Sequence, residues 1–173
     1  KKADAETNEA KKENFKAFAL ALESAKTLAN RYADIAAEKA KTADEARKKE
    51  LLHLEKTLRK VPAGPSTSLF EAIQCFMLLW EIMCLEQAPN PFAFSVGNAD
   101  RIFEPYRAMD NMSREDAASL LKHFLVFFNV GDRSWTISES LLVSGKVETG
   151  NVLSNKTSYA LMDAYLDMNL PQP

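Results

Sequence analysis

Glycine is scarce in this sequence, with five among 173 residues, which is about half of the roughly 7% usual in globular proteins. So few glycines argue against a loop-rich β-sandwich and favour long helices. The only cysteines, Cys75 and Cys84, fall within one apolar stretch, and no Cys-x-x-Cys pair occurs. A disulfide framework is therefore not expected, and two unpaired thiols favour a reducing, cytoplasmic compartment.

Histidine is equally rare, since His53 and His123 are the only two. Neither has another metal-ligating residue at a familiar spacing, so no metal site is predicted. The sequence has no Gly-x-Ser-x-Gly motif, and the stretch SLLVSGKV lacks two of the residues that a phosphate-binding loop requires. Spacing alone thus identifies no catalytic residue.

A long uncharged apolar run is also missing. The most apolar stretch, residues 69–86, contains Glu71, Gln74 and Glu81, which are costly in lipid. It therefore predicts a buried helix rather than a membrane span. The net charge is −2, and the basic residues of the first part alternate with acidic ones, as on solvated helix faces. This pattern disfavours binding to nucleic acid.

What the sequence does contain is helical periodicity. Apolar residues recur every three or four positions between about Ala10 and Ala40, which predicts a long helix. Two segments, 42–45 and 68–71, match the capping box and predict the starts of a second helix and of the buried helix. The apolar stripe of the long helix comprises Phe15, Phe18, Leu22, Ala25, Ala29, Tyr32 and Ala36.

The second part of the chain is more varied. Residues 88–106 are rich in proline and aromatics and predict an ordered loop, a kind of segment that often carries function. Ser113 is predicted to cap a helix that ends at Gly131. Apolar and β-branched residues without helical period predict a strand at Leu141–Ser144, followed by a final helix from about Asn155 to Met168.

Three side chains near that strand and helix have two interpretations each. Trp135 is either a core anchor or a pocket wall, and base rates favour the core. Asp163 and Asp167 lie one helical turn apart and could share a site, although solvated positions are the more common case. Composition and spacing alone therefore predict a single, mostly helical domain without identifiable chemistry.

Several short motifs, taken in their order along the chain, resemble those of a known protein family. Residues 31–74 begin with RYADIAAEKA and continue from RKKEL through VPAGP into FEAIQ, and residues 95–106 read SVGNADRIFEPY. Residues 138–173 contain a strand that ends in Gly145, a helix with Asn155 and a final Leu-Pro-Gln-Pro. Together these motifs resemble the glycyl radical enzymes related to pyruvate formate-lyase. The sequence departs from the usual family residues at Asn98, Arg101, Ser144, Lys156 and Thr157, so the resemblance leaves the subfamily and substrate open.

The resemblance implies a ten-stranded α/β barrel in which a glycyl radical takes a hydrogen atom from a cysteine thiol. In the family that cysteine and glycine lie C-terminal to the matched stretch, and neither Cys75 nor Cys84 matches the Cys-Val loop. We therefore expect a mainly α fragment that forms the helical wall of the barrel, with one or two short strands near residues 137–147. Its segments would be 1–62, with long helices, 66–131, with core helices and the proline-rich loop, and 135–173, with the strand and final helix.

The implied parent protein is an anaerobic, cytoplasmic lyase or dehydratase of the formate acetyltransferase type. Its partners would be a small-molecule substrate and an iron–sulfur, S-adenosylmethionine-dependent activase that installs the glycyl radical, with a homodimer as a further option. The fragment itself would hold no cofactor and would have no turnover. Five residues are expected to approach the barrel interior, because active sites gather at strand ends: Trp135, Glu139, Ser140, Gly145 and Asn155.

A stand-alone helical interaction module is the alternative. Such a module would bind a partner through exposed apolar surface and would be a well-behaved monomer or dimer. The radical-enzyme interpretation instead predicts an unpaired strand edge at Leu141–Val143, with a tendency to associate through it.

Overall fold

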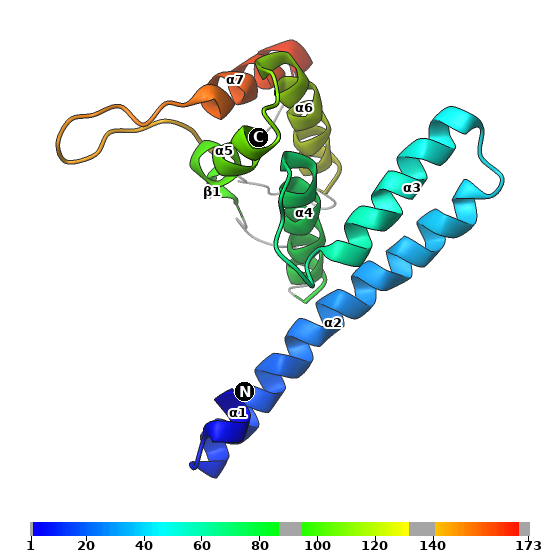
Figure 1. Cartoon of the computed structure of the whole chain (residues 1–173). Coiled ribbons are helices and arrows are strands. Elements are labelled where there is room, and N and C mark those ends of the chain that lie inside the picture. The colour runs from blue at the N-terminus through cyan, green and yellow to red at the C-terminus, as the bar shows by residue number, and fades with distance from the viewer. Residues whose placement is uncertain (1, 87–94, 132–140, 170–173) are drawn as a thin grey trace. The chain divides into compact units, whose positions relative to one another are not determined.

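The computed structural model of the chain describes residues 2–86, 95–131 and 141–169 (Figure 1). The fold is mainly helical, as the scarcity of glycine predicts. The chain divides into two compact units, residues 1–65 and residues 66–173.

The first unit is a helical hairpin in which α3 folds back along α2 (Figure 1). Its helices are α1 (Lys2–Ala5), α2 (Glu9–Ala40) and α3 (Glu45–Lys60). The predicted long helix is confirmed, and it begins where the Asn8 side chain accepts a hydrogen bond of 3.1 Å from the Lys11 amide.

The apolar stripe of α2 is buried only toward its C-terminal end. Alanines pack there against α3, because their small side chains permit close approach of the two helices, whereas Phe18 remains 63% exposed and Leu22 70% exposed. The apolar stripe was predicted over the whole helix, but within this unit only its C-terminal part packs against another helix. The buried positions of α2 are Ala25, Ala29, Ala33, Ala36 and Ala40.

The start of α3 corrects the sequence prediction. The N-cap is Asp44, whose carboxylate accepts hydrogen bonds from the amides of Ala46 at 3.0 Å and Arg47 at 2.9 Å. The capping box predicted to open at Thr42 is therefore wrong. Aspartate is as good an N-cap as threonine or better, so the helix begins at the later of the two candidates.

The described residues of the second unit form four helices and two short strands. Two predicted caps are confirmed there: Ser68 Oγ accepts from the Glu71 amide at 3.1 Å, and Ser113 Oγ accepts from the Asp116 amide at 3.0 Å. The elements are α4 (Leu69–Glu86), β1 (Gly97–Asn98), α5 (Ala99–Met109), α6 (Arg114–Gly131), β2 (Leu141–Leu142) and α7 (Lys156–Met168).

Helix α4 is buried along the face that carries Leu69, Ile73 and Trp80, which confirms the predicted buried helix for that face. Leu79, Met83 and Leu85, toward its C-terminal end, are exposed. Among the described residues, no helix has both the length and the apolarity that crossing a bilayer would need.

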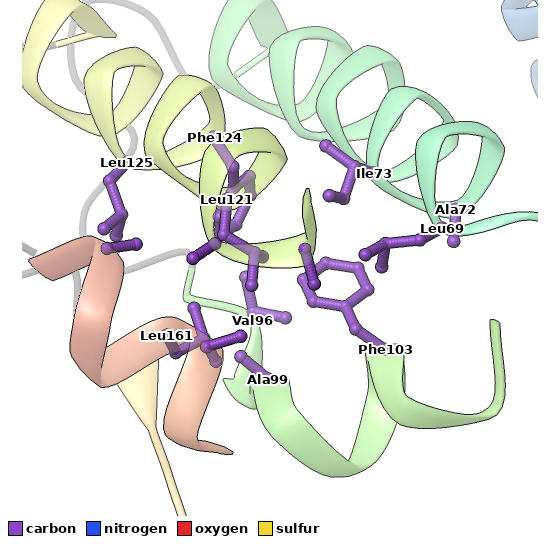
Figure 2. Close-up of a cluster of buried hydrophobic side chains, with 14 residues drawn as sticks. Leu69, Ala72, Ile73, Val96, Ala99, Phe103, Leu121, Phe124, Leu125 and Leu161 are labelled. Carbon is purple, nitrogen blue, oxygen red and sulfur yellow. The ribbon is translucent and has the colours of Figure 1, made fainter. Parts of the chain in front are cut away.

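The four helices described in the second unit contribute to one hydrophobic core (Figure 2). The Phe103 ring from α5 meets the Phe124 ring from α6 edge to face, with 5.5 Å between ring centroids. This contact packs α5 against α6, and Leu161 and Ala164 bring α7 into the same core. The core consists of Leu69, Ala72, Ile73, Val96, Ala99, Phe103, Ala117, Ala118, Leu121, Phe124, Leu125, Ala160, Leu161 and Ala164.

The loop predicted over residues 88–106 is wrong for its second part, because α5 begins at Ala99 and includes residues 99–106. Pro105 lies inside the helix and removes one backbone hydrogen bond. Ala99, Phe103 and Arg107 are nevertheless buried at four-residue intervals, so packing of one helical face outweighs the cost of the proline. Residues 87–94 of the predicted loop lie outside the described part of the chain.

The predicted strand is confirmed at Leu141–Leu142, and it pairs in parallel with β1. Gly97 faces Leu141, and Asn98 faces Leu142. This partner was not predicted, because two residues are too few for a recognisable β pattern. Within the described ranges β2 has one neighbouring strand, so the predicted unpaired edge is paired on one side.

Candidate functional site

The chain turns sharply at the carboxyl end of β2. Ser144 has a φ of 64° and Gly145 a φ of 125°, so two consecutive residues adopt conformations that L-residues avoid. A hairpin follows, closed by the Leu153 amide, which donates to the Gly145 carbonyl at 2.9 Å, and by a bridge between Lys146 and Val152.

Gly145, one of the residues predicted to approach a substrate, therefore lies at the base of this hairpin. The space beside it is open enough for a side chain, because the nearest atom to a Cβ there would be Leu153 Cδ1 at 3.8 Å. Backbone conformation, rather than crowding, is what favours glycine at this position.

Asp100, in the first turn of α5, holds this turn in place. Its side chain is fully buried, and Oδ2 accepts hydrogen bonds from the Ser144 amide at 2.6 Å and from Ser158 Oγ at 2.5 Å. Oδ1 accepts from the Arg101 amide at 2.8 Å. One carboxylate thus connects the start of α5, the end of β2 and the start of α7.

Asn155, the second predicted site residue in the described chain, caps α7. Its side chain accepts from the Ser158 amide at 3.0 Å, and Ser158 Oγ accepts from the Asn155 amide at 2.9 Å. This reciprocal capping box satisfies two backbone donors at the helix start. Because Ser158 also donates to Asp100, the cap and the carboxylate form one network.

Glu104 makes a second connection between α5 and α7, one helical turn beyond Asp100. Its Oε2 accepts from Thr157 Oγ1 at 2.7 Å and from the Thr157 amide at 3.1 Å. Arg107 is 6% exposed and donates to both oxygens of Glu104 and to the Met112 carbonyl at 2.7 Å.

These contacts perturb the pKa of Glu104. The hydrogen bond from Arg107 lowers it, burial opposes that effect, and the hydrogen bonds from Thr157 lower it further, to about 2. The carboxylate is therefore ionised at neutral pH. The α5–α7 polar junction, which we define as Asp100, Glu104, Ser144, Thr157 and Ser158, is thus built around carboxylate acceptors.

The sequence predictions cover only part of this region. Trp135, Glu139 and Ser140 lie outside the described residues. Gly145 and Asn155 belong to one connection between β2 and α7, and Asp100 ties both ends of that connection through Ser144 and Ser158. Sequence reasoning missed Asp100 and Glu104. The sequence did contain a signal for them: charged and apolar residues recur at helical spacing between Ala99 and Met109. That stretch was interpreted as a loop.

Asp163 and Asp167, which could have shared a site, instead pair with separate cations of α6. Asp163 forms a two-pronged ion pair with Arg114, and Lys122 Nζ lies 2.7 Å from Asp167. Both carboxylates are partly exposed, in keeping with the solvated positions that the sequence favoured. Across the part of the chain that the structure describes, no three His, Cys, Asp or Glu residues gather as metal ligands would.

The family model for pyruvate formate lyase-like proteins matches residues 1–173. The chain is 28% identical over 169 residues to an indoleacetate decarboxylase of Tractidigestivibacter scatoligenes, covering 88% of this chain and 19% of that protein. It is 29% identical over 180 residues to a trans-4-hydroxy-L-proline dehydratase of Clostridioides difficile, covering 94% of this chain and 23% of that protein.

A crystal structure of a glycyl radical enzyme from Archaeoglobus fulgidus superposes with a TM-score of 0.78 at 25% identity, over 87% of this chain and 21% of that one. The protein therefore belongs to the pyruvate formate lyase-like family and is homologous to glycyl radical enzymes. The chain spans about a fifth of the length of these relatives.

Cys75 is half-buried within α4, where burial raises the pKa of its thiol.

Proposed function

We propose that this chain is the helical wall and first strand region of an anaerobic, cytoplasmic glycyl radical lyase or dehydratase. The match of the family model along residues 1–173 carries the proposal. Relatives of similar identity are named as a decarboxylase and a dehydratase, so the bond that is broken is left open. The radical glycine, the working cysteine and the activase contacts would belong to parts of the protein beyond this chain.

In this proposal the role of the chain is structural. The α5–α7 polar junction and the hydrophobic core hold β2 at a fixed place on the helices, and β1 fixes its register. Further strands of the proposed barrel would continue the sheet from β2. Gly145 and Asn155 remain proposed substrate-facing residues, together with Trp135, Glu139 and Ser140.

The surface beside β2 supports a barrel-wall role. Leu142, Val143 and Met162 are exposed, at 55%, 40% and 51%. An apolar depression of about 130 Å³ adjoins them, lined by Leu125, Leu141, Val143, Leu161, Met162 and Tyr165. Apolar side chains gathered beside a strand are the surface that neighbouring strands and helices of a larger domain would cover.

The proposal is tested first by the gene and then by the enzyme. A Cys-Val loop within about a hundred codons of Pro173, followed by an Arg-Val-x-Gly motif, is expected, and a stop codon soon after Pro173 would contradict it. The complete protein, treated anaerobically with its activase and S-adenosylmethionine, should show a protein radical by electron paramagnetic resonance. The 173-residue chain, treated identically, should show neither radical nor turnover.

The alternative, a stand-alone helical interaction module, has one observation in its favour: the exposed apolar side chains of α2, Phe18, Leu20 and Leu22. The two proposals differ in which surface drives association. Size-exclusion chromatography of a Leu142→Lys variant should show less self-association under the barrel-wall proposal. A Leu22→Lys variant should do so if α2 is the partner-binding face.

A further inference from the structure

We propose that Asp100 is a positioning residue that holds Ser144 in its left-handed backbone conformation. It thereby sets the direction in which the chain leaves the carboxyl end of β2. The inference rests on the proposed function for its importance to catalysis, because Gly145, a proposed substrate-facing residue, follows Ser144 directly.

Ser144 needs an external restraint. A φ of 64° is sterically unfavourable for a residue with a side chain. Such conformations persist only where the surroundings determine them strongly, and they concentrate at functional sites. Gly145 follows with a φ of 125°, so a relaxed Ser144 would redirect the whole hairpin.

Asp100 supplies the restraint through the Ser144 amide, which donates to Oδ2 at 2.6 Å. The carboxylate is 0% exposed, so water cannot take over this hydrogen bond without opening the structure. A second polar contact of Ser144 joins its Oγ to Ser154 Oγ at 2.6 Å, and this contact does not involve the backbone amide.

Asp100 is itself held firmly. It lies in the first turn of α5 and accepts from Ser158 in the first turn of α7. The amino ends of both helices carry partial positive charge that favours a carboxylate between them. The restraint on Ser144 is therefore anchored in two helices rather than in a loop.

Amide hydrogen exchange in the full 173-residue chain tests the proposal. In Asp100→Asn, exchange at the amides of Ser144 and Leu153 should accelerate by about tenfold or more relative to the amide of Leu121 in α6. Asp110→Asn is the matched control, because Asp110 Oδ2 accepts from the Leu69 amide at 2.7 Å and also joins two elements. It should leave the Ser144-to-Leu121 ratio unchanged.

Rescue separates positioning from simple stabilisation. Glycine adopts the left-handed conformation without penalty, so Ser144→Gly should restore most of the lost protection at Leu153 in the Asp100→Asn background and none in the Asp110→Asn background. Uniform acceleration at every amide, or no selective rescue, would overturn the proposal.

A milder variant covers the case in which Asp100→Asn fails to fold. Ser154→Ala removes the hydroxyl contact alone and should change exchange at Ser144 by no more than about twofold. A tenfold acceleration would show that the hydroxyl pair, not Asp100, holds the turn. None of these rates depends on radical chemistry, so failure of the proposed function would leave them unaltered.

Discussion

Glu104 and Thr157 join α5 to the first turn of α7 through a single oxygen. Glu104 Oε2 accepts from both the amide and the hydroxyl of Thr157, and the same oxygen accepts from Arg107 Nε at 2.9 Å. A partly buried carboxylate therefore lies between a guanidinium group and the amino end of a helix. Both neighbours favour its negative charge, so loss of that charge should lower the free energy of unfolding.

The stability of the second unit should depend on pH through Glu104. Its pKa falls from 4.5 to about 2 in the folded chain. The stabilisation is therefore complete above pH 4.5 and is lost as the pH falls toward 2. Because Glu104 is partly exposed, solvent screening reduces this contribution to the free energy of unfolding to roughly 1–2 kcal/mol. Urea unfolding between pH 5 and pH 2 should show the free energy of unfolding falling across this window, and Glu104→Gln should flatten that fall. An identical slope in the variant would contradict the assignment.

Replacing Arg107 should destabilise the chain strongly. Arg107→Met leaves Glu104 without its cation and the Met112 carbonyl without its donor, and loss of one partner of a buried pair costs about 3 kcal/mol or more. Arg107→Lys should recover only part of this, because an ammonium group cannot reproduce the forked geometry.

Urea unfolding measures both Arg107 variants, with Arg114→Met as the control. Arg114 pairs with Asp163 at the surface, so its loss should cost less than about 1 kcal/mol. Equal losses at the two arginines would show that burial of Arg107 is unimportant.

Substitution of Asn155 distinguishes capping from contact with a substrate. Asn155→Ala should lower the free energy of unfolding by about 1 kcal/mol, and Asn155→Asp should leave it nearly unchanged, because aspartate caps as well as asparagine. Chemical denaturation checks the stability of both. If Asn155→Asp folds normally but the complete enzyme with this substitution loses turnover, the Asn155 side chain also contacts the substrate. Unchanged turnover would leave it a cap alone.

The aromatic pair of the core should be costly to break. Phe124→Ala removes a fully buried ring that packs against Phe103, and should cost about 3–5 kcal/mol. Phe18→Ala changes the same side chain at a position that is 63% exposed and should have little effect. Thermal unfolding compares the two variants, and similar losses would contradict the assigned core.

The helices could be predicted from sequence because their signals are local. Periodicity and capping located α2, the start of α4, α6 and α7 within a residue or two. Helix α5 was missed because Pro105 and its aromatic neighbours suggest a loop, whereas burial of Phe103 and Arg107 decides the matter. That burial depends on elements far away in the sequence, and no local pattern reveals it.

The α5–α7 polar junction could not be predicted from sequence, because its partners are also far apart along the chain. Asp100 and Ser144 are 44 residues apart, and Glu104 and Thr157 are 53 apart. Neither pair has a spacing that a motif could describe. Gly145 and Asn155 were predicted from their position near the strand end in the barrel that the resemblance implies. The structure adds the backbone conformation of Gly145 and the helix cap made by Asn155.

The parallel pairing of β1 with β2 also constrains the order of folding. Each strand has only two residues, and the chain between them must close a long loop before either gains a partner. Closing a loop of this length costs entropy that two short strands cannot repay by themselves. Packing of α5 against α6 shortens the loop that remains to be closed, so we expect the strand pair to form only after these helices have packed.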